Sequence, residues 1–296
     1  MQSDVQCLVL PKILVESGFS LDTHLFRYRS DNLIKNDDGA IELGYGVKEL
    51  LTNSIWHSCI SALNDPFEVY FQQNDEEAYT ISDSELFFYW VNSFESNKHQ
   101  REVLEGFFKE NNEDIRRTLA SNISSYIHIL KETFRTHTAI ACFSTCCDSR
   151  LMWGYYCSGF KGFCLIYNKK LLENNLTYLN HVVYSKHRPK LDVISFFIRR
   201  KRNENVSEIS NLAIYKHAEW IHEKELRSIL MIDNEHSIND GGFSIQLNGS
   251  CVDGVIIGEG CNEKTKEAII LSSKKRGIKI FYAHADLDLF NISISQ

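Results

Sequence analysis

The hydrophobic pattern of this chain changes its period twice, and that change does most to restrict the fold. Up to about residue 67, apolar residues occur in short strand-like runs, whereas from 82 to about 135 they recur at helical spacing. Strand-like runs then return over residues 138–144, 162–167, 177–185, 224–232, 243–247, 252–257, 277–283 and 287–294. Because strands and helices do not alternate regularly, the pattern predicts an α+β fold with a largely antiparallel sheet, and not a doubly wound parallel one.

The helical block interrupts strand-rich sequence, and no low-complexity linker separates the parts. We therefore predict a single α+β domain over residues 1–296 with a helical insertion at about 80–136. The first structured segment is expected to be a strand at 24–30, followed by a strand at 55–58. Further helices are predicted at 46–52, 149–157, 191–218 and 262–276.

Acidic residues outnumber basic ones by 39 to 32, which gives a formal net charge of −7. This charge argues against a protein that binds nucleic acid over its whole surface, but it does not exclude a local basic groove. The run Arg199, Arg200, Lys201 and Arg202 and the shorter run at 274–276 are candidate phosphate-binding patches, with solvated helix faces as the alternative.

The nine cysteines are scattered, and their only adjacent pair, Cys146 and Cys147, lacks zinc-site spacing and accompanying histidines, so we expect no metal. Residues 1–10 contain an acidic residue and no long apolar run, and no segment approaches the roughly 20 apolar residues that span a bilayer. The expected location is therefore the reducing cytoplasm, without membrane contact.

Several widespread motifs are absent from the sequence. There is no G-x-x-x-x-G-K-[ST] loop, no H-E-x-x-H pair and no G-x-S-x-G turn, which argues against P-loop nucleotidases, zinc hydrolases of that type and α/β-hydrolases. The glycines Gly254, Gly258 and Gly260 do not have the spacing of a dinucleotide fingerprint.

Three local clusters could carry chemistry. In the first, strand alternation places Arg27 and Arg29 on one face beside aromatic residues, and a guanidinium group suits phosphate or carboxylate. Two surface arginines on an edge strand are the alternative. In the second, Trp153 and Tyr156 follow a strand at 142–144 and could form a flat pocket wall, although aromatic residues at helical spacing also suit a core.

The third cluster lies between residues 220 and 230. A strand that begins near Glu223 would place Glu223, Glu225 and Arg227 on one face, with Leu226 toward the core. A salt-bridged strand edge is one explanation of this pattern. Paired carboxylates around an oxocarbenium-like transition state, as in glycoside hydrolysis, are another.

Together these clusters resemble a bacterial family known only as a domain of unknown function, which is often found near phage-defence genes. The resemblance spans about residues 24–285 and rests on Arg27-Tyr28-Arg29, Asn64-Asp65-Pro66-Phe67, Cys142-Phe143-Ser144, Met152-Trp153-Gly154-Tyr155-Tyr156 with Lys161-Gly162, and Trp220 through Arg227. Tyr155 and Phe160 stand where many relatives have histidine, so no role of those histidines is carried over.

The layout is also similar to that of ADP-ribosyltransferases that modify nucleic acid, and this similarity implies a split antiparallel sheet around NAD. It implies that Glu225 is the catalytic carboxylate and that Glu223 orients or deprotonates the acceptor. The residues implied to bind NAD, as phosphate, ribose or nicotinamide contacts, are Arg27, Arg29, Ser58, Asn64, Trp153 and Tyr156.

The resulting hypothesis is an NAD-dependent ADP-ribosyltransferase toxin of a bacterial anti-phage system. RNA is the expected acceptor, bound through Arg199, Arg200, Lys201 and Arg202, and a neutralising antitoxin protein is the expected partner. Two alternatives stay open. One is an NAD glycohydrolase that depletes NAD, and the other is a non-catalytic component of a defence system that binds nucleic acid or a partner.

Overall fold

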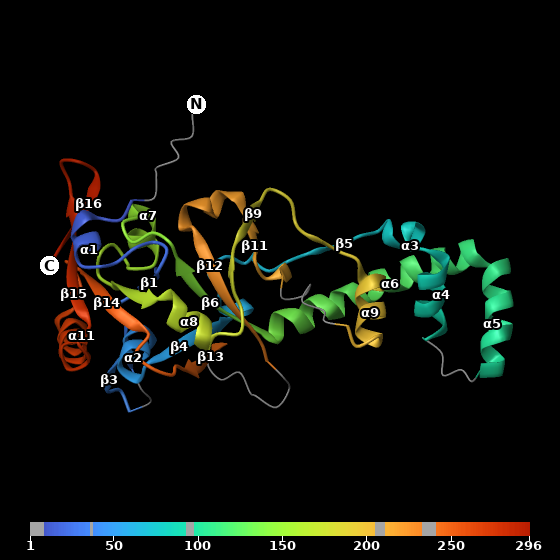
Figure 1. The fold of residues 1–296 in the computed structure, drawn as a ribbon, viewed down its shortest axis with the longest axis horizontal. Coiled ribbons are helices and arrows are strands. Elements are labelled where there is room, and N and C mark those ends of the chain that lie inside the picture. Colours follow the sequence, from blue (N-terminus) through green and yellow to red (C-terminus); the bar gives the residue numbers. More distant parts are fainter. Residues whose placement is uncertain (1–8, 36–37, 93–97, 205–210, 233–240) are drawn as a thin grey trace.

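The computed structural model describes residues 9–35, 38–92, 98–204, 211–232 and 241–296. In this part of the chain, a ten-stranded sheet has helices on both faces, and a helical arm extends from one end (Figure 1). The strands run in the order β13-β4-β6-β1-β7-β14-β15-β16, and β12 lies between β6 and β8. All pairs in this sheet are antiparallel except β14 with β15, which confirms the prediction of an α+β fold with a largely antiparallel sheet.

The strands of the main sheet are β1 (His24–Arg29), β4 (Ser54–Cys59), β6 (Thr138–Ser144), β7 (Phe163–Asn168), β8 (Leu179–His181), β12 (Glu225–Met231), β13 (Gly242–Gln246), β14 (Val252–Gly258), β15 (Lys279–Asp286) and β16 (Asn291–Ser295). Three two-stranded pairs lie outside it: β2 (Leu33–Lys35) with β3 (Ile41–Leu43), β5 (Gln72–Gln73) with β10 (Lys190–Leu191), and β9 (Val183–Ser185) with β11 (Tyr215–His217).

The described helices are α1 (Lys12–Glu16), α2 (Tyr45–Thr52), α3 (Glu77–Thr80), α4 (Asp83–Val91), α5 (Lys98–Glu110), α6 (Asn112–Thr136), α7 (Arg150–Tyr155), α8 (Lys169–Asn175), α9 (Val193–Lys201) and α11 (Glu263–Arg276), with 3-10 turns η1 (Ile60–Ala62) and η2 (Ala218–Glu223). Local sequence sets the ends of several of them. In α11, for example, the Asn262 side chain accepts the backbone N–H of Thr265, and Gly277 ends the helix at a φ of +68°.

The sheet divides at β6, which changes its neighbour partway along one edge. Ala139 and Ile140 pair with β4, whereas Ser144 on the same strand pairs with Phe26 of β1. Because β12 occupies the other edge of β6, β4 and β1 follow one another along a single edge and leave a gap between them. This gap, which we call the split, is where side chains from both faces of the sheet can meet.

The helical arm consists of α3, α4, α5, α6 and α9 (Figure 1). Its longest helix, α6, has 25 residues, which corresponds to a length of about 37 Å at 1.5 Å per residue. One hydrophobic cluster joins Ile140 and Ile229 of the sheet to Phe108, Ile123 and Phe196 of the arm. The arm is therefore connected to the sheet through a continuous core.

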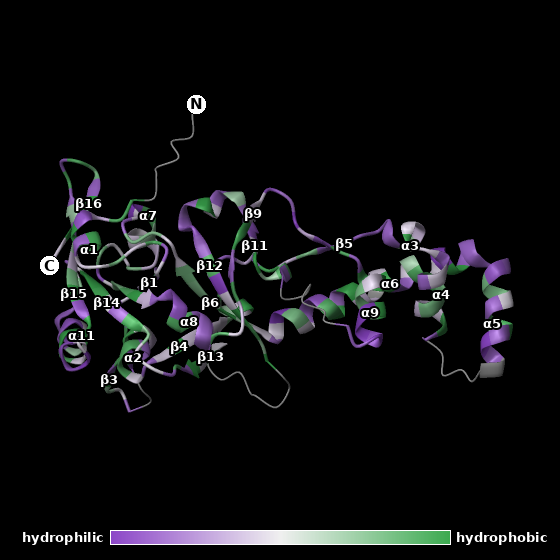
Figure 2. Ribbon diagram, viewed as in Figure 1, coloured by the Kyte–Doolittle hydropathy of each residue, from purple (hydrophilic) through white to green (hydrophobic). Residues whose placement is uncertain are grey.

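Two more hydrophobic clusters cover the two faces of the sheet. Leu50 of α2 and Ile269 of α11 pack on one face, and Leu14 of α1 and Trp153 of α7 pack on the other. In Figure 2, hydrophobic residues lie along the central strands, and hydrophilic residues lie along α11 and α5. The outer sides of these helices therefore face water.

Some of the predicted elements are wrong. The helix predicted at 191–218 ends at Lys201, since Asn203 adopts a left-handed φ of 55°, and β11 and η2 follow residues 205–210, which lie outside the described part. The strand predicted at 177–185 is two strands, because the chain changes partner between His181, which pairs with Leu226 of β12, and Val183, which pairs with Tyr215 of β11. The structure also begins before residue 24, with α1.

The described cysteines, which exclude Cys7, are all free thiols. Burial raises the pKa of the adjacent pair, to about 11 for Cys146 and further for Cys147, so both remain protonated. Among the described residues, no group of histidine, cysteine and carboxylate side chains is arranged to hold a metal ion. None of the helices in this part of the chain has the length and apolar character needed to cross a membrane.

Candidate functional site

A cavity of about 230 Å³ lies at the split in the sheet. Its walls come from β1, β4, β6, α7, β11 and the segments around Asn64 and Glu223. Except for Trp153, all the residues predicted for catalysis and NAD binding line this cavity. These residues are Arg27, Arg29, Ser58, Asn64, Tyr156, Glu223 and Glu225. Residues separated by up to two thirds of the chain therefore converge on one cavity.

One group of charges, the arginine cluster, consists of Arg27, Arg29 and Glu49. Arg27 donates to the two Glu49 carboxylate oxygens at 3.3 and 3.0 Å, and Arg29 binds the same carboxylate, with its Nε 2.7 Å from Oε2. The backbone N–H of Trp56 also donates to Glu49 Oε1, at 2.7 Å. Helix α2 thus supplies one carboxylate to two guanidinium groups, which leaves one positive charge in excess.

The pKa values of this cluster agree with its geometry. Burial alone would raise the pKa of Glu49, but the two arginines hold it below its ordinary value, so the carboxylate is ionised. Burial lowers the pKa of Arg27, and the neighbouring Arg29 lowers it further. Burial opposes the charge of Arg29 as well, but Glu49 outweighs that effect and raises its pKa.

The two arginines differ in what they can offer a ligand. The Arg27 guanidinium is 4% exposed and also donates to the carbonyl oxygens of Cys142 at 3.0 Å and Trp56 at 2.6 Å. The Arg29 side chain is 22% exposed, and its Nη1 has no partner among the described residues. Of the two arginines predicted to bind phosphate, Arg29 is therefore the one with donors available to a ligand.

The second group, the carboxylate cluster, consists of Glu68, Glu223, Glu225, Lys216 and Arg227. Lys216 Nζ contacts all three carboxylates: Glu68 at 2.8 Å, Glu225 at 3.2 Å and Glu223. Arg227 binds Glu225 at 2.9 Å and also pairs with Glu68. Three carboxylates share two cations, which leaves one negative charge in excess.

The surroundings of the cluster move the pKa values of Glu223 and Glu225 in opposite directions. For Glu223, burial and the nearby Glu225 charge raise the pKa against the effect of Lys216. For Glu225, burial is outweighed by Arg227 and Lys216, which lower the pKa. Two adjacent carboxylates therefore differ in character: Glu225 stays ionised, and Glu223 is the one able to take up a proton.

A hydrogen-bond chain connects this cluster to the cavity mouth. Asn64 Nδ2 donates to the Tyr156 hydroxyl at 3.3 Å, and that hydroxyl donates to Glu223 Oε1 at 2.6 Å. Burial and the Glu223 charge raise the pKa of Tyr156, so its hydroxyl keeps its proton. Ser144 Oγ donates to the Glu223 backbone carbonyl at 2.6 Å and holds this segment against β6.

The two clusters reach the cavity from opposite faces of the sheet. Glu225 and Phe26 both pair with Ser144, so their side chains share a face, and Arg27, one residue further along β1, points to the other. The split brings the two faces together. Glu223 does not lie on the strand as predicted, because it ends η2 and Lys224 adopts a left-handed φ of 47° before β12 begins.

The match to a known family covers part of this site. Residues 152–228 match the family described as "Protein of unknown function (DUF2971)". No curated protein and no solved structure shows a match to the chain. The matched segment contains Tyr156, Lys216, Glu223, Glu225 and Arg227, so it supplies most of the carboxylate cluster.

Trp153 does not line the cavity, so its predicted role in stacking on nicotinamide is wrong. Its side chain is 0% exposed, its indole N–H donates to the Cys147 carbonyl at 2.8 Å, and its ring stacks on Phe160 with centroids 5.3 Å apart. Met152 of α7 and Tyr156, which directly follows that helix, line the cavity, whereas Trp153 lies wholly within the core.

The basic run lies away from this cavity. Arg199, Arg200, Lys201 and Arg202 are at the end of α9, which packs against α3 and α4 of the arm (Figure 1). Arg202 lies over the Phe88 ring at 4.8 Å. The candidate phosphate-binding patch at 199–202 therefore belongs to the arm and does not line this cavity.

The sequence analysis missed three charged residues of the site. Glu49 lies on a helix that was predicted, but its burial among Val47 and Leu50 is visible only once α2 packs on the sheet. Glu68 directly follows the Asn64-to-Phe67 turn, and this position next to a predicted site residue could have identified it from the sequence. Lys216 lies in a segment predicted to be helical, where a strand places it between the carboxylates instead.

Proposed function

We propose that this protein cleaves the bond between nicotinamide and ribose in NAD and transfers the ADP-ribose to an acceptor. The observation that carries the proposal is the excess negative charge of the carboxylate cluster at one side of the cavity, opposite the excess positive charge of the arginine cluster. NAD has the complementary arrangement, because its nicotinamide end is cationic and its diphosphate is anionic.

The proposed chemistry uses that negative charge in the transition state. When the C1′–N bond breaks, its electron pair stays on nicotinamide, which leaves as a neutral molecule, and positive charge develops on the ribose. A carboxylate that is already ionised and held in place stabilises this charge more in the transition state than in the ground state. Glu225, bound by Arg227 and Lys216, has this character.

The acceptor then forms a bond to C1′ and loses a proton. Glu223, whose pKa is raised, is the base we assign to that proton. The overall change is balanced: NAD and an acceptor with an O–H or N–H group give nicotinamide, the ADP-ribosylated acceptor and one proton. Water as acceptor gives free ADP-ribose.

Other residues of the cavity would position NAD. Arg29 presents free guanidinium N–H groups for the diphosphate, and Ser58, Asn64 and Tyr156 present hydroxyl and amide groups for the ribose or the nicotinamide amide. A cavity of about 230 Å³ is smaller than the roughly 300–1,000 Å³ that encloses drug-sized ligands. It therefore suits the nicotinamide riboside end of NAD, with the diphosphate at its mouth.

The test is incubation of the pure protein with NAD labelled on its adenylate, together with total RNA, DNA and cell extract. Label on a macromolecule supports ADP-ribosyl transfer, and free ADP-ribose supports NAD hydrolysis. Glu225→Gln should lower kcat by about 100- to 1,000-fold, while Glu173→Gln, an exposed change on α8, should leave it unchanged. Untouched NAD, or full activity of Glu225→Gln, would contradict the proposal.

The specific competitor is a purely structural ion network. Lys216 and Arg227 contact the Glu225 carboxylate at both oxygens, and Glu223 is only 2% exposed. If the network is structural, Glu225→Gln changes stability but wild-type protein leaves NAD intact. RNA as the acceptor, the toxin role and the antitoxin remain predictions that the resemblance supplies.

A further inference from the structure

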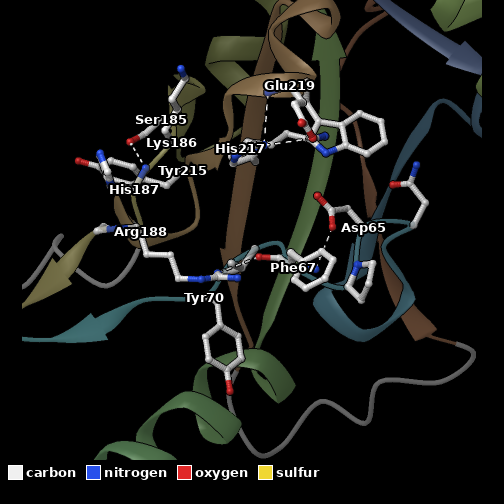
Figure 3. Close-up of a pocket in the computed structure, with 16 residues that line it drawn as sticks. Asp65, Phe67, Tyr70, Ser185, Lys186, His187, Arg188, Tyr215, His217 and Glu219 are labelled. Atoms are coloured by element: carbon white, nitrogen blue, oxygen red, sulfur yellow. Dashed lines mark hydrogen bonds and ion pairs between the residues drawn. The ribbon is translucent and has the colours of Figure 1, made fainter.

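A second cavity, of about 570 Å³, adjoins the first (Figure 3). Asn64 and Lys216 line both cavities, so the two spaces meet at these residues. The second cavity lies between the loop at 185–190, the segment at 64–70 and the segment at 215–220. Its lining combines flat aromatic rings with cationic side chains.

Cations surround one tyrosine at this cavity. Lys131, Arg135 and Arg188 lie 5.0, 5.8 and 5.1 Å from the centroid of the Tyr70 ring. Lys186 lines the same cavity, and Lys190 begins β10 directly after the last lining residue of that loop, Pro189. We call these cations the basic strip, and its members are Lys131, Arg135, Lys186, Arg188 and Lys190.

The basic strip has no acidic counterpart in the structure. None of its five members forms an ion pair with another described residue, whereas the arginines and the lysine of the first cavity all do. Two acidic residues, Asp65 and Glu219, also line the second cavity. Asp65 is buried and accepts the backbone N–H of Phe67 at 2.8 Å, and Glu219 faces His217 at 3.4 Å. In a chain with a net charge of −7, five cations beside two carboxylates make a local excess of positive charge.

An exposed aromatic ring accompanies the strip. Phe67 is 69% exposed, yet its backbone is fixed, since its N–H is bound by Asp65 and its carbonyl accepts Arg188 Nη1 at 3.0 Å. Figure 3 shows Arg188 reaching across the cavity toward Phe67 and Tyr70. An exposed ring on a fixed backbone beside cations offers a base a stacking surface next to phosphate contacts.

We propose that the second cavity and the basic strip bind single-stranded nucleic acid. The five cations of the strip, none in an ion pair with another described residue, outnumber the two negative charges of a dinucleotide diphosphate, so the strip fits an anionic chain with several phosphates. Phe67 provides the stacking that a single strand allows and a duplex hides. The claim that this strand is the acceptor rests on the proposed function, because only then does the shared boundary at Asn64 and Lys216 lead it to the ribose.

Binding is measured without NAD, by fluorescence anisotropy of labelled twelve-residue oligouridylate and oligothymidylate over a series of salt concentrations. A duplex of the same length and a labelled polyglutamate peptide are the competitors. At least one of the two single strands should bind more tightly than the duplex. Tighter binding of oligouridylate than of oligothymidylate identifies the ligand as RNA, and the reverse identifies it as DNA. Equal binding of the duplex would overturn stacking, and equal binding of polyglutamate would overturn the nucleic-acid assignment.

The charge contribution is tested with Lys186→Gln/Lys190→Gln, two exposed changes. Because each phosphate contact on a single strand contributes about 0.7 to the slope of log K against log salt, the slope should fall by about 1.4. The matched control, Lys169→Gln/Lys170→Gln, removes the same charge from α8 and should leave the slope unchanged. If Arg200→Gln/Lys201→Gln on α9 lowers the slope instead, the site is on the arm and the proposal is wrong.

The stacking contribution is tested with Phe67→Ala. Because the ring is exposed, its loss should not unfold the protein, and it should weaken single-strand binding by about tenfold with the salt slope unchanged. An unchanged affinity would remove Phe67 from the site. Strand binding without NAD cleavage would overturn the proposed function alone, and NAD cleavage without strand binding would overturn this inference alone.

Discussion

The arginine cluster and the carboxylate cluster are built from the same kinds of side chain but carry opposite excess charge. Arg27 and Arg29 share one carboxylate, whereas Lys216 and Arg227 share three. Each is buried on its own face of the sheet, and the split between β1 and β4 lets both reach one cavity. Neither cluster is balanced alone, but together they sum to neutrality.

This difference indicates what kind of ligand the cavity favours. A buried cluster with one unbalanced charge is less stable than a balanced one, because desolvation is compensated only by matched partners. A ligand with a cationic end and an anionic end would balance both clusters at once. A ligand of one charge sign would balance one cluster and add to the excess of the other.

The largest expected effect comes from unbalancing the carboxylate cluster further. Arg227→Met leaves three carboxylates with Lys216 alone, and since Arg227 is fully buried, the free energy of unfolding should fall by about 3–5 kcal/mol. Urea unfolding measures it. Arg117→Met removes an exposed pair with Asp114 and serves as the control, with an expected change below about 0.5 kcal/mol.

Arg29→Met makes the opposite change, because it leaves Glu49 paired one-to-one with Arg27. The free energy of unfolding should therefore fall by less than about 2 kcal/mol, and less than for Arg227→Met. In NAD cleavage assays the loss of this diphosphate contact should raise KM about tenfold with kcat nearly unchanged. A loss of stability as large as that of Arg227→Met would show that the two clusters do not differ as described.

The sequence predicted the parts of this site that depend on local pattern. Strand alternation placed Arg27 with Arg29 and Glu225 with Arg227. What it could not supply is the partner across the fold. Arg27 and Glu49 are 22 positions apart, and Arg227 and Glu68 are 159 apart, so their pairing follows from packing and not from spacing.

Trp153 and α9 show the same limit. Met152 and Trp153 both belong to one buried cluster, and helical spacing does not show that Met152 reaches the cavity whereas Trp153 does not. The basic run on α9 was recognisable as a charged helix end, yet its place on the arm depends on contacts between α9 and α4. The structure has the largely antiparallel sheet and the gap between β1 and β4. That this sheet is of the ADP-ribosyltransferase type stays a prediction.

The smallest effects concern pH, and they separate the clusters by sign. The pKa of Glu223 is raised above 4.5, so between pH 4.5 and the raised value the folded state binds more proton than the unfolded state, and stability falls as pH rises. Glu223→Gln should therefore gain stability relative to the wild type as pH increases from about 4.5 to about 7, by at most about 1.4 kcal/mol for each unit by which the pKa is raised.

Glu49 should show the reverse dependence. Its pKa is lowered below 4.5, so its contribution to stability is complete above that pH and is lost as pH falls through the folded pKa. The stability deficit of Glu49→Gln relative to the wild type should therefore shrink below pH 4.5. Urea unfolding at a series of pH values measures both slopes. Slopes of the same sign would mean that the two carboxylates experience the same environment, and the contrast between an anion-rich and a cation-rich side of the cavity would be wrong.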